Sequence, residues 1–376
     1  MSHRFLASLG AAVVIAVVSL ATVRVAGPTS LRSFVGVAEA GGGGAQAPSP
    51  AAKTTAAPKT WTPPRAPDGH PDLQGVWNFS TLTPLERPDE FAGKPFLTEV
   101  EAAEYEKRRI ESGNADRRDG AGDADVARAY NEFWYDRGKT VVATRRTSLI
   151  IDPPDGKLPP MTPQGQKRAG ALAAFLRQGV RGPLDSPTTR PVRERCIWWD
   201  SEGPPLTPMN AYNSNFQLLQ NRGHVVILME MIHDARIIPL DGRPHLSRSI
   251  PQLLGDSRGR WEGDTLVIDT TNFRDKADFI DPTSFTDKTD YRGAGPNVHL
   301  IERLTRVDAD TLLYEYTVED PTTWTRPWTA RQFVTKIPSP IYEYACHEGN
   351  YGMAGILSGA RAEEKAAAEA AKKGSR

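Results

Sequence analysis

Apolar and polar residues alternate along most of the chain after residue 214, and this pattern predicts antiparallel β-strands. Shorter alternating runs precede it. The predicted strand segments are residues 73–79, 147–151, 215–220, 224–240, 260–272, 299–307, 311–319, 329–336 and 341–345. Residues 224–240 are too many for one strand of ordinary length, so we expect a bend near His233 and Asp234. Gly263-Asp264 and Asp308-Ala309-Asp310 predict hairpin turns.

Helical signals gather in the first half of the chain. Thr98 followed by Glu101 is a capping box, which predicts a helix over residues 99–112 that stops at Gly113. A second helix is predicted over residues 123–136 from an apolar stripe at helical spacing: Val126, Tyr130, Phe133 and Trp134. Pro after Thr162 predicts the start of a third helix that ends near residue 179.

These elements predict a mainly β fold with a helical insertion (α+β). About seven to nine strands in sequential hairpins favour an antiparallel up-and-down β-barrel, wrapped by about three helices. We expect a single domain over residues 70–362, with the helical insertion at residues 80–195. Residues 363–376 are expected to be a frayed C-terminal helix.

The N-terminal segment carries export signals. Residues 5–23 form an uncharged apolar run after His3 and Arg4, which is typical of a signal peptide or of an uncleaved membrane anchor. We therefore assign residues 1–40 to a signal peptide or anchor. Residues 41–69 are rich in Gly, Ala, Pro and Thr and predict a disordered linker. The protein is expected to be periplasmic or extracellular.

The charge balance limits the classes of binding partner, and the two cysteines predict a covalent link. The chain has 46 basic and 46 acidic residues, which argues against a nucleic-acid partner and against a membrane contact beyond the N-terminal segment. In an exported protein, Cys196 and Cys346 predict a disulfide. Closing that loop is worth roughly 4–5 kcal/mol by the loop-entropy model. Two buried free thiols are the alternative.

Two resemblances add to this picture. Gly75-x-Trp77 in the first predicted strand is similar to the G-x-W of lipocalins and other calycins, which implies a calycin-like barrel. A buried core Trp on any strand is the alternative. Four longer phrases together resemble an uncharacterised family of secreted bacterial proteins: PDLQGVWNFSTLTPLERP, HDARIIPLDGRPH, GDSRGRWEGDTLVIDTTNF and YEYACHEGNYG. That resemblance implies export and a shared fold, but no catalytic residues.

Ionisable residues inside apolar strands are the main candidates for chemistry, because a buried charge needs a partner or a ligand. His233 and His347 are candidate acids or bases, oriented by Asp234 and Glu348. Arg236 is a candidate to stabilise negative charge, and Tyr344 is a further acid. An internal Asp–Arg pair and a surface turn are the structural alternatives.

Substrate contacts are assigned to a second set of residues: Trp198, Arg243, His245, Trp324 and Trp328. Aromatic side chains stack on sugars and on flat ligands, although core packing explains them equally well. No organic cofactor is predicted. A divalent metal is left open, with His233, His245 and His347 as ligands.

The sequence therefore predicts an exported acid–base enzyme, namely a lyase, isomerase or hydrolase, that acts on a carbohydrate-like or aromatic molecule in a barrel pocket. A non-catalytic, lipocalin-like binding protein is the alternative. Gly255-Asp256-Ser257-Arg258-Gly259 matches the G-x-S-x-G of serine hydrolases, but a hairpin is predicted after it where that motif needs a helix. A structural envelope protein is a third possibility.

Overall fold

The fold is taken from a computed structural model of the chain. The structure describes residues 61–118, 120, 122, 131–177, 184–190, 194–197, 203–208, 212–274 and 297–374. For residues 171–177 and 189 it describes the backbone but not the side chains. The predicted signal segment, most of the linker, most of the second predicted helix and Trp198 lie outside the described residues.

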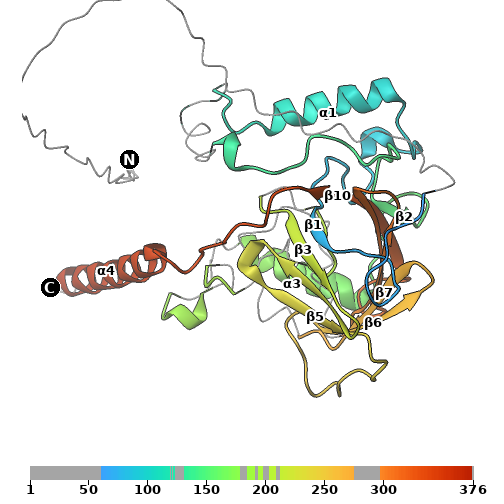
Figure 1. Ribbon diagram of the computed structural model, residues 1–376. Coiled ribbons are helices and arrows are strands. Elements are labelled where there is room, and N and C mark those ends of the chain that lie inside the picture. The colour runs from blue at the N-terminus through green and yellow to red at the C-terminus, as the bar shows by residue number, and fades with distance from the viewer. Residues whose placement is uncertain are drawn as a thin grey trace, which may run out of the picture. The chain divides into compact units, whose positions relative to one another are not determined.

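Ten antiparallel strands form one strongly curved sheet (Figure 1). The strands are β1 Gly75–Asn78, β2 Ile150–Asp152, β3 Asn215–Gln220, β4 His224–Met229, β5 Ala235–Pro239, β6 Asp256–Glu262, β7 Thr265–Thr271, β8 His299–Arg306, β9 Thr311–Glu319 and β10 Trp328–Ile337. The mainly β fold predicted from the alternating pattern is confirmed.

The strand order is β5-β4-β3-β1-β10-β9-β8-β7-β6, and β2 pairs with β10. Apart from β2, neighbours in the sheet are also neighbours in the chain, or join its first and last strands. This is up-and-down connectivity. The sheet does not close into a barrel by hydrogen bonds, because its two ends, β5 and β6, lie beside each other without pairing.

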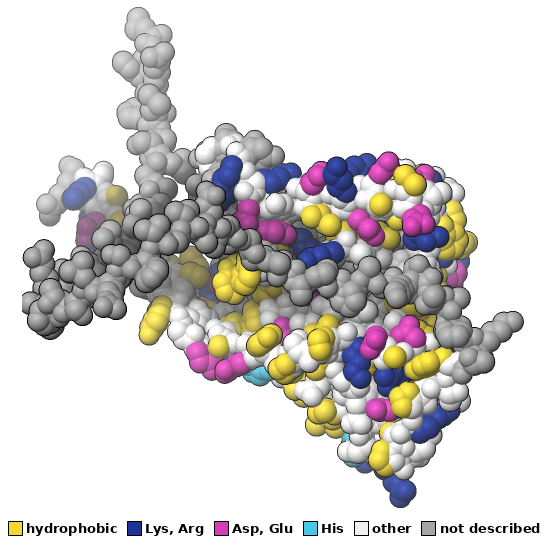
Figure 2. Space-filling view, turned by 45° about the horizontal axis from the view of Figure 1, so that its top comes forward, with side chains coloured by type: hydrophobic (Ala, Val, Ile, Leu, Met, Phe, Trp, Pro, Cys, Tyr) yellow, Lys and Arg dark blue, Asp and Glu magenta, His cyan; other side chains and the backbone are white. Residues whose placement is uncertain are grey.

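Three helices are described beside the sheet. They are α1 Glu99–Gly113, α3 Pro163–Arg177 and α4 Tyr351–Gly374, with short 3₁₀ turns η1 Asp89–Phe91, η2 Glu132–Trp134, η3 Pro187–Thr189 and η5 Met231–His233. The capping box at the start of α1 is confirmed, since Thr98 and Glu101 exchange both hydrogen bonds. On the face shown in Figure 2, basic and acidic side chains of the described residues alternate, and neither sign forms a broad patch.

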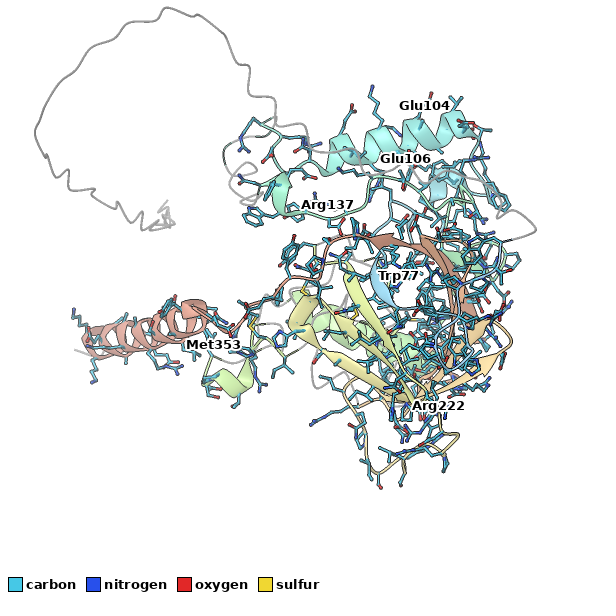
Figure 3. The ribbon with its side chains drawn as sticks, viewed as in Figure 1. Trp77, Glu104, Glu106, Arg137, Arg222 and Met353 are labelled. Atoms are coloured by element: carbon cyan, nitrogen blue, oxygen red, sulfur yellow. A yellow bond between two sulfur atoms is a disulfide. The ribbon has the colours of Figure 1, made fainter. Side chains whose placement is uncertain are left out.

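Inward-facing side chains fill the curved sheet. Alternate residues are buried in most strands, and β9 shows a strict pattern of half-buried and buried positions. Trp77 of the G-x-W motif is completely buried inside the sheet (Figure 3), and its indole N–H donates to the Leu73 carbonyl at 3.0 Å. Trp324 and Trp328 are also buried and meet edge to face. Their rings therefore contribute to the core.

The seam between β5 and β6 is packed closely. A Cβ atom on Gly259 of β6 would lie 2.6 Å from Leu240 Cδ2 and 2.9 Å from Ile238 Cγ2, so a larger residue here would have to displace these side chains. Across the same seam, Arg236 of β5 bonds to Ser257 of β6 and forms an ion pair with Glu302 of β8. Side chains therefore connect the two ends of the sheet where backbone hydrogen bonds do not.

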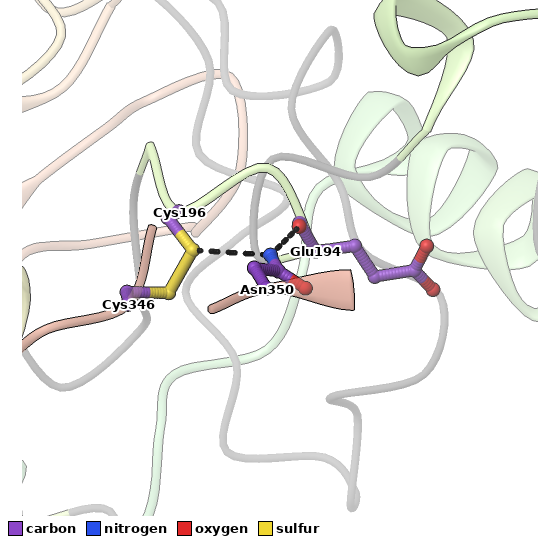
Figure 4. Close-up of a disulfide and its surroundings, with 4 residues drawn as sticks. All are labelled: Glu194, Cys196, Cys346 and Asn350. Carbon is purple, nitrogen blue, oxygen red and sulfur yellow. Dashed lines mark hydrogen bonds between the residues drawn. A yellow bond between two sulfur atoms is a disulfide. The ribbon is translucent and has the colours of Figure 1, made fainter. Parts of the chain in front are cut away.

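The predicted disulfide is confirmed: Cys196 is bonded to Cys346 (Figure 4). The Asn350 side-chain amide lies against Cys196 Sγ and the Glu194 carbonyl. The bond holds the segment after β10 against the end of the helical insertion. That segment contains the predicted strand over residues 341–345, which is wrong: these residues form no strand.

Candidate functional site

A row of polar side chains crosses three neighbouring strands at one end of the sheet. In the register of β1 with β3, Asn78 is paired with Asn215. In the register of β3 with β4, Phe216 is paired with Met229, which brings Asn215 beside Glu230, the residue that follows β4. All three have the strand parity opposite to the core residues Trp77, Phe216 and Met229, so the row lies on the outer face of the sheet.

Glu230 is the centre of this row. Its side chain is only 4% exposed, and a buried carboxylate is costly without compensating bonds. It accepts hydrogen bonds from Asn213 Nδ2 at 2.8 Å, from Asn215 Nδ2 at 3.2 Å and from the Tyr342 backbone N–H at 3.2 Å. Each of these donors is neutral. Glu230 thereby joins its own segment to the segment of Asn213 and Asn215 and to the segment of Tyr342.

A second carboxylate belongs to the same network. Asn78 Nδ2 donates to Asp136 Oδ2 at 2.7 Å and also lies 2.8 Å from Asn215 Oδ1. Ser80 Oγ donates to Asp136 Oδ1 at 3.0 Å. Asp136 is half-buried and its described partners are neutral. Each carboxylate oxygen accepts one of these hydrogen bonds and can accept another.

These residues line a pocket of about 670 Å³. The lining residues are Phe133, Trp134, Tyr135, Asp136, Tyr212, Asn213, Asn215, Glu230, Tyr342, Tyr344, Ala345 and Cys346. Six are aromatic and two are carboxylates, and the described lining contains no Lys, Arg or His. Such a pocket favours an uncharged or cationic ligand over an anionic one.

Backbone strain marks the chain beside this pocket. Asn213 has a φ of 57°, and Ile232 and His233, just after Glu230, have φ values of 59° and 54°. Side chains other than glycine rarely adopt this region, and a β-branched residue such as Ile232 does so at a real cost. Such strain clusters at functional sites, which is consistent with a ligand-binding role for this end of the sheet.

The predicted catalytic residues do not gather in one place. Tyr344 lines the pocket, whereas Arg236 lies inside the sheet in its ion pair with Glu302. His233 is exposed, and Asp234 is half-buried with one oxygen that has no hydrogen-bond partner in the described structure. Among the described residues, no group of three or more His, Cys, Asp and Glu side chains is preformed to hold a metal ion, and this includes His233.

The remaining candidates are also dispersed. Glu348 lines a smaller pocket of about 350 Å³ beside the disulfide, and His347 is exposed. Arg243 is exposed and bonds to Asp241, which lowers the pKa of Asp241 to about 2. His245 is half-buried between Asp256 and Asp269. Ser257 of the G-x-S-x-G motif is buried in β6 and bonds to Arg236 and Thr270. The strand continues to Glu262, so the helix that a nucleophile elbow needs does not follow Ser257.

Glu230 interrupts an apolar run in the sequence, but no role was predicted for it, and Asn78, Asn215 and Asp136 were not predicted as site residues. Asn78, Asn215 and Glu230 meet through cross-strand register, which cannot be read from spacing along the chain.

No family model, no curated protein and no solved structure matches this chain. Across the part of the chain that the structure describes, no helix is long and apolar enough to cross a membrane.

Proposed function

We propose that this is an exported small-molecule-binding protein whose ligand is uncharged and rich in hydroxyl groups, such as a carbohydrate. The observation that carries the proposal is the pocket in which aromatic side chains surround the carboxylates of Asp136 and Glu230. Its volume is within the range of about 300–1,000 Å³ that is common for small-molecule sites. Export is supported by the Cys196–Cys346 disulfide and by the apolar N-terminal run.

The pocket chemistry fits such a ligand. Aromatic faces such as those of Trp134 and Tyr344 stack on the apolar C–H faces of a sugar ring. Asp136 accepts hydrogen bonds from ligand hydroxyls, and Asn213 supplies an amide that both donates and accepts. Glu230 already binds Asn213, Asn215 and Tyr342, so its role is to hold the pocket wall in place.

An acid–base enzyme is the second candidate, as a lyase, isomerase or hydrolase. The observation that favours it is that Asp136 and Tyr344 line the same pocket, where a carboxylate and a phenol are suited to move protons. His233, Asp234 and Arg236 do not line this pocket.

A thermal-shift screen of neutral sugars, amino sugars and aromatic alcohols, followed by calorimetric titration of the hits, tests the proposal. We expect Asp136→Asn to weaken the bound sugar about tenfold or more, since each lost charged hydrogen bond is worth about 1.5–3 kcal/mol. His347→Ala changes an exposed neighbour outside the pocket and is the matched control. Equal affinity in wild type and Asp136→Asn would place the site elsewhere.

The same samples separate binding from catalysis. If nuclear magnetic resonance of the bound compound shows new products with wild type and none with Asp136→Asn, the protein is an enzyme. If the ligand is recovered unchanged, the protein is a binding module. Tight binding of amino sugars alone would change the ligand class to cationic.

A calycin-like barrel belongs to this proposal as well. The up-and-down strand order and the buried Trp77 of Gly75-x-Trp77 support it. An experimental structure with β5 and β6 joined by backbone hydrogen bonds would establish it.

A further inference from the structure

A second cluster of ionisable side chains lies on the outer face of β7, β8 and β9. His299 begins β8 and is paired with Glu319 of β9 in the strand register. Its Nδ1 atom lies 3.0 Å from Glu319 Oε2, and its Nε2 atom lies 3.1 Å from Asp269 Oδ1. Asp269 belongs to β7, so the imidazole bridges the strands on either side of its own.

His245 repeats this arrangement from the loop between β5 and β6. Its Nδ1 atom lies 3.0 Å from Asp256 Oδ2, and its Nε2 atom lies 3.0 Å from the same Asp269 Oδ1. Asp256 is itself fixed by the Leu246 backbone N–H and by Arg258. Two imidazole Nε2 atoms from distant segments therefore converge on one carboxylate oxygen.

This geometry is typical of metal-binding histidines. A histidine ligand usually donates its second ring N–H to a carboxylate, which fixes the ring and leaves the other nitrogen to bind the ion. Asp256 and Glu319 occupy those outer positions here. The separations of 3.0 and 3.1 Å between each Nε2 and Asp269 Oδ1 are close to the spacing of two ligand atoms around an ion with bonds of about 2.0–2.2 Å.

We propose that His245, His299 and Asp269 bind one divalent transition-metal ion, such as zinc, and that Asp256 and Glu319 orient the two rings. Two histidines and one carboxylate suit zinc, iron(II) and cobalt(II). The three side chains are 28%, 33% and 28% exposed, so an ion reaches them from solvent. The inference is independent of the pocket around Glu230.

The site is not preformed, since both Nε2 atoms are bonded to Asp269 Oδ1. An ion would enter between the three ligand atoms, about 2.0–2.2 Å from each, after a small shift of the partly exposed Asp269 carboxylate. Without an ion, the competing state is a chain of hydrogen bonds between the carboxylates and the two rings. Consistent with that state, the bond to Asp269 raises the pKa of His299.

A bound ion would fasten the loop that carries His245 to β7 and β8. This loop starts at the β5–β6 seam, where the sheet lacks backbone hydrogen bonds. The metal would thus act as a clamp across the open side of the sheet.

Titration of the chelator-treated, tag-free protein with Zn²⁺ by calorimetry tests the proposal, and Co²⁺ with its visible absorption reports imidazole ligation. We expect one ion per chain and a raised melting temperature. His299→Asn and Asp269→Asn should each abolish saturable binding. Glu319→Gln should weaken it about 10- to 100-fold while leaving the metal-free melting temperature unchanged.

His233→Ala and His347→Ala are matched controls, because both side chains are exposed and lie outside the cluster. Either control should bind Zn²⁺ like wild type. The proposal is overturned if wild type shows no saturable binding, or if His299→Asn and Glu319→Gln bind as tightly as wild type. In that case the cluster is a chain of ion pairs only.

Discussion

Arg236 shows how the same residue type serves opposite roles on the two faces of one sheet. Inside, its guanidinium binds both oxygens of Glu302, at 3.1 and 2.6 Å, and neither side chain is more than 3% exposed. On the outer face, Arg331 binds Glu315 across neighbouring strands, with 42% and 25% exposure. Removing one partner from a buried pair leaves an uncompensated charge, whereas water replaces a partner at the surface.

We therefore expect Glu302→Gln to lower the free energy of unfolding by about 3–5 kcal/mol. Glu315→Gln, the same change on the neighbouring strand, should cost about 0–1 kcal/mol. Urea denaturation of both variants makes the comparison. Similar small losses in the two variants would show that the interior of the sheet is hydrated enough to screen Arg236.

Tyr314 extends this buried network and gives it a pH dependence. Its hydroxyl donates to Glu302 Oε1 at 2.8 Å and accepts from the Leu206 backbone N–H at 3.0 Å. Burial, followed by the nearby Glu302 charge, raises the pKa of Tyr314 well above its ordinary value. Below pH 10 the phenol is protonated in both states, so its ionisation does not affect stability there. Above pH 10 only the unfolded chain loses the proton, which favours unfolding.

The stability difference between wild type and Tyr314→Phe should therefore shrink as pH rises. At pH 8 we expect wild type to be more stable by about 1–3 kcal/mol, because the variant leaves buried polar groups unpaired. At pH 11 that advantage should fall by about 1.4 kcal/mol, the value of one pH unit above the unfolded pKa. Guanidinium denaturation at both values measures it. A constant difference would mean that Tyr314 ionises in the folded protein.

At the scale of elements, the alternation of apolar and polar residues was sufficient to predict strands that have one buried face. It predicted β3 with the observed bounds and the bend that separates β4 from β5. Both long hairpins follow from short turns between alternating runs. These predictions succeeded because each strand's pattern depends on its own two faces and on little else.

Two elements differ from the sequence prediction. Residues 341–345 were predicted as a strand, but β10 already pairs with β1, β2 and β9, and these residues do not pair with any described strand. The C-terminal helix begins at Tyr351, before the predicted residue 363, although Gly352, Gly355 and Gly359 weaken it. The pocket was not predicted, since Asn78, Asn215 and Glu230 meet only through the register of three strands.

At the scale of the whole molecule, backbone hydrogen bonds do not close the sheet, so side chains at the β5–β6 seam and the disulfide add the missing connections. Side chains of Arg236 and Glu302 connect the seam, and the proposed metal site lies on the outside of the same region. Cys196–Cys346 joins the helical insertion to the segment that supplies Tyr342 and Tyr344 to the pocket. The bond therefore couples stability to the shape of the candidate site.

Removing that bond in the Cys196→Ser/Cys346→Ser variant should lower the free energy of unfolding by about 2–5 kcal/mol, since a loop with a sequence separation of 150 is no longer closed in the unfolded chain. The sheet should stay intact, because its strands are joined by their own ladder. Urea denaturation measures the loss, and far-ultraviolet circular dichroism of the folded variant checks the sheet. Trypsin should cleave the variant sooner than wild type after Arg195, because the broken bond frees the chain beside Cys196. A variant as stable and as resistant as wild type would show that other contacts fix the wall formed by Tyr342 and Tyr344.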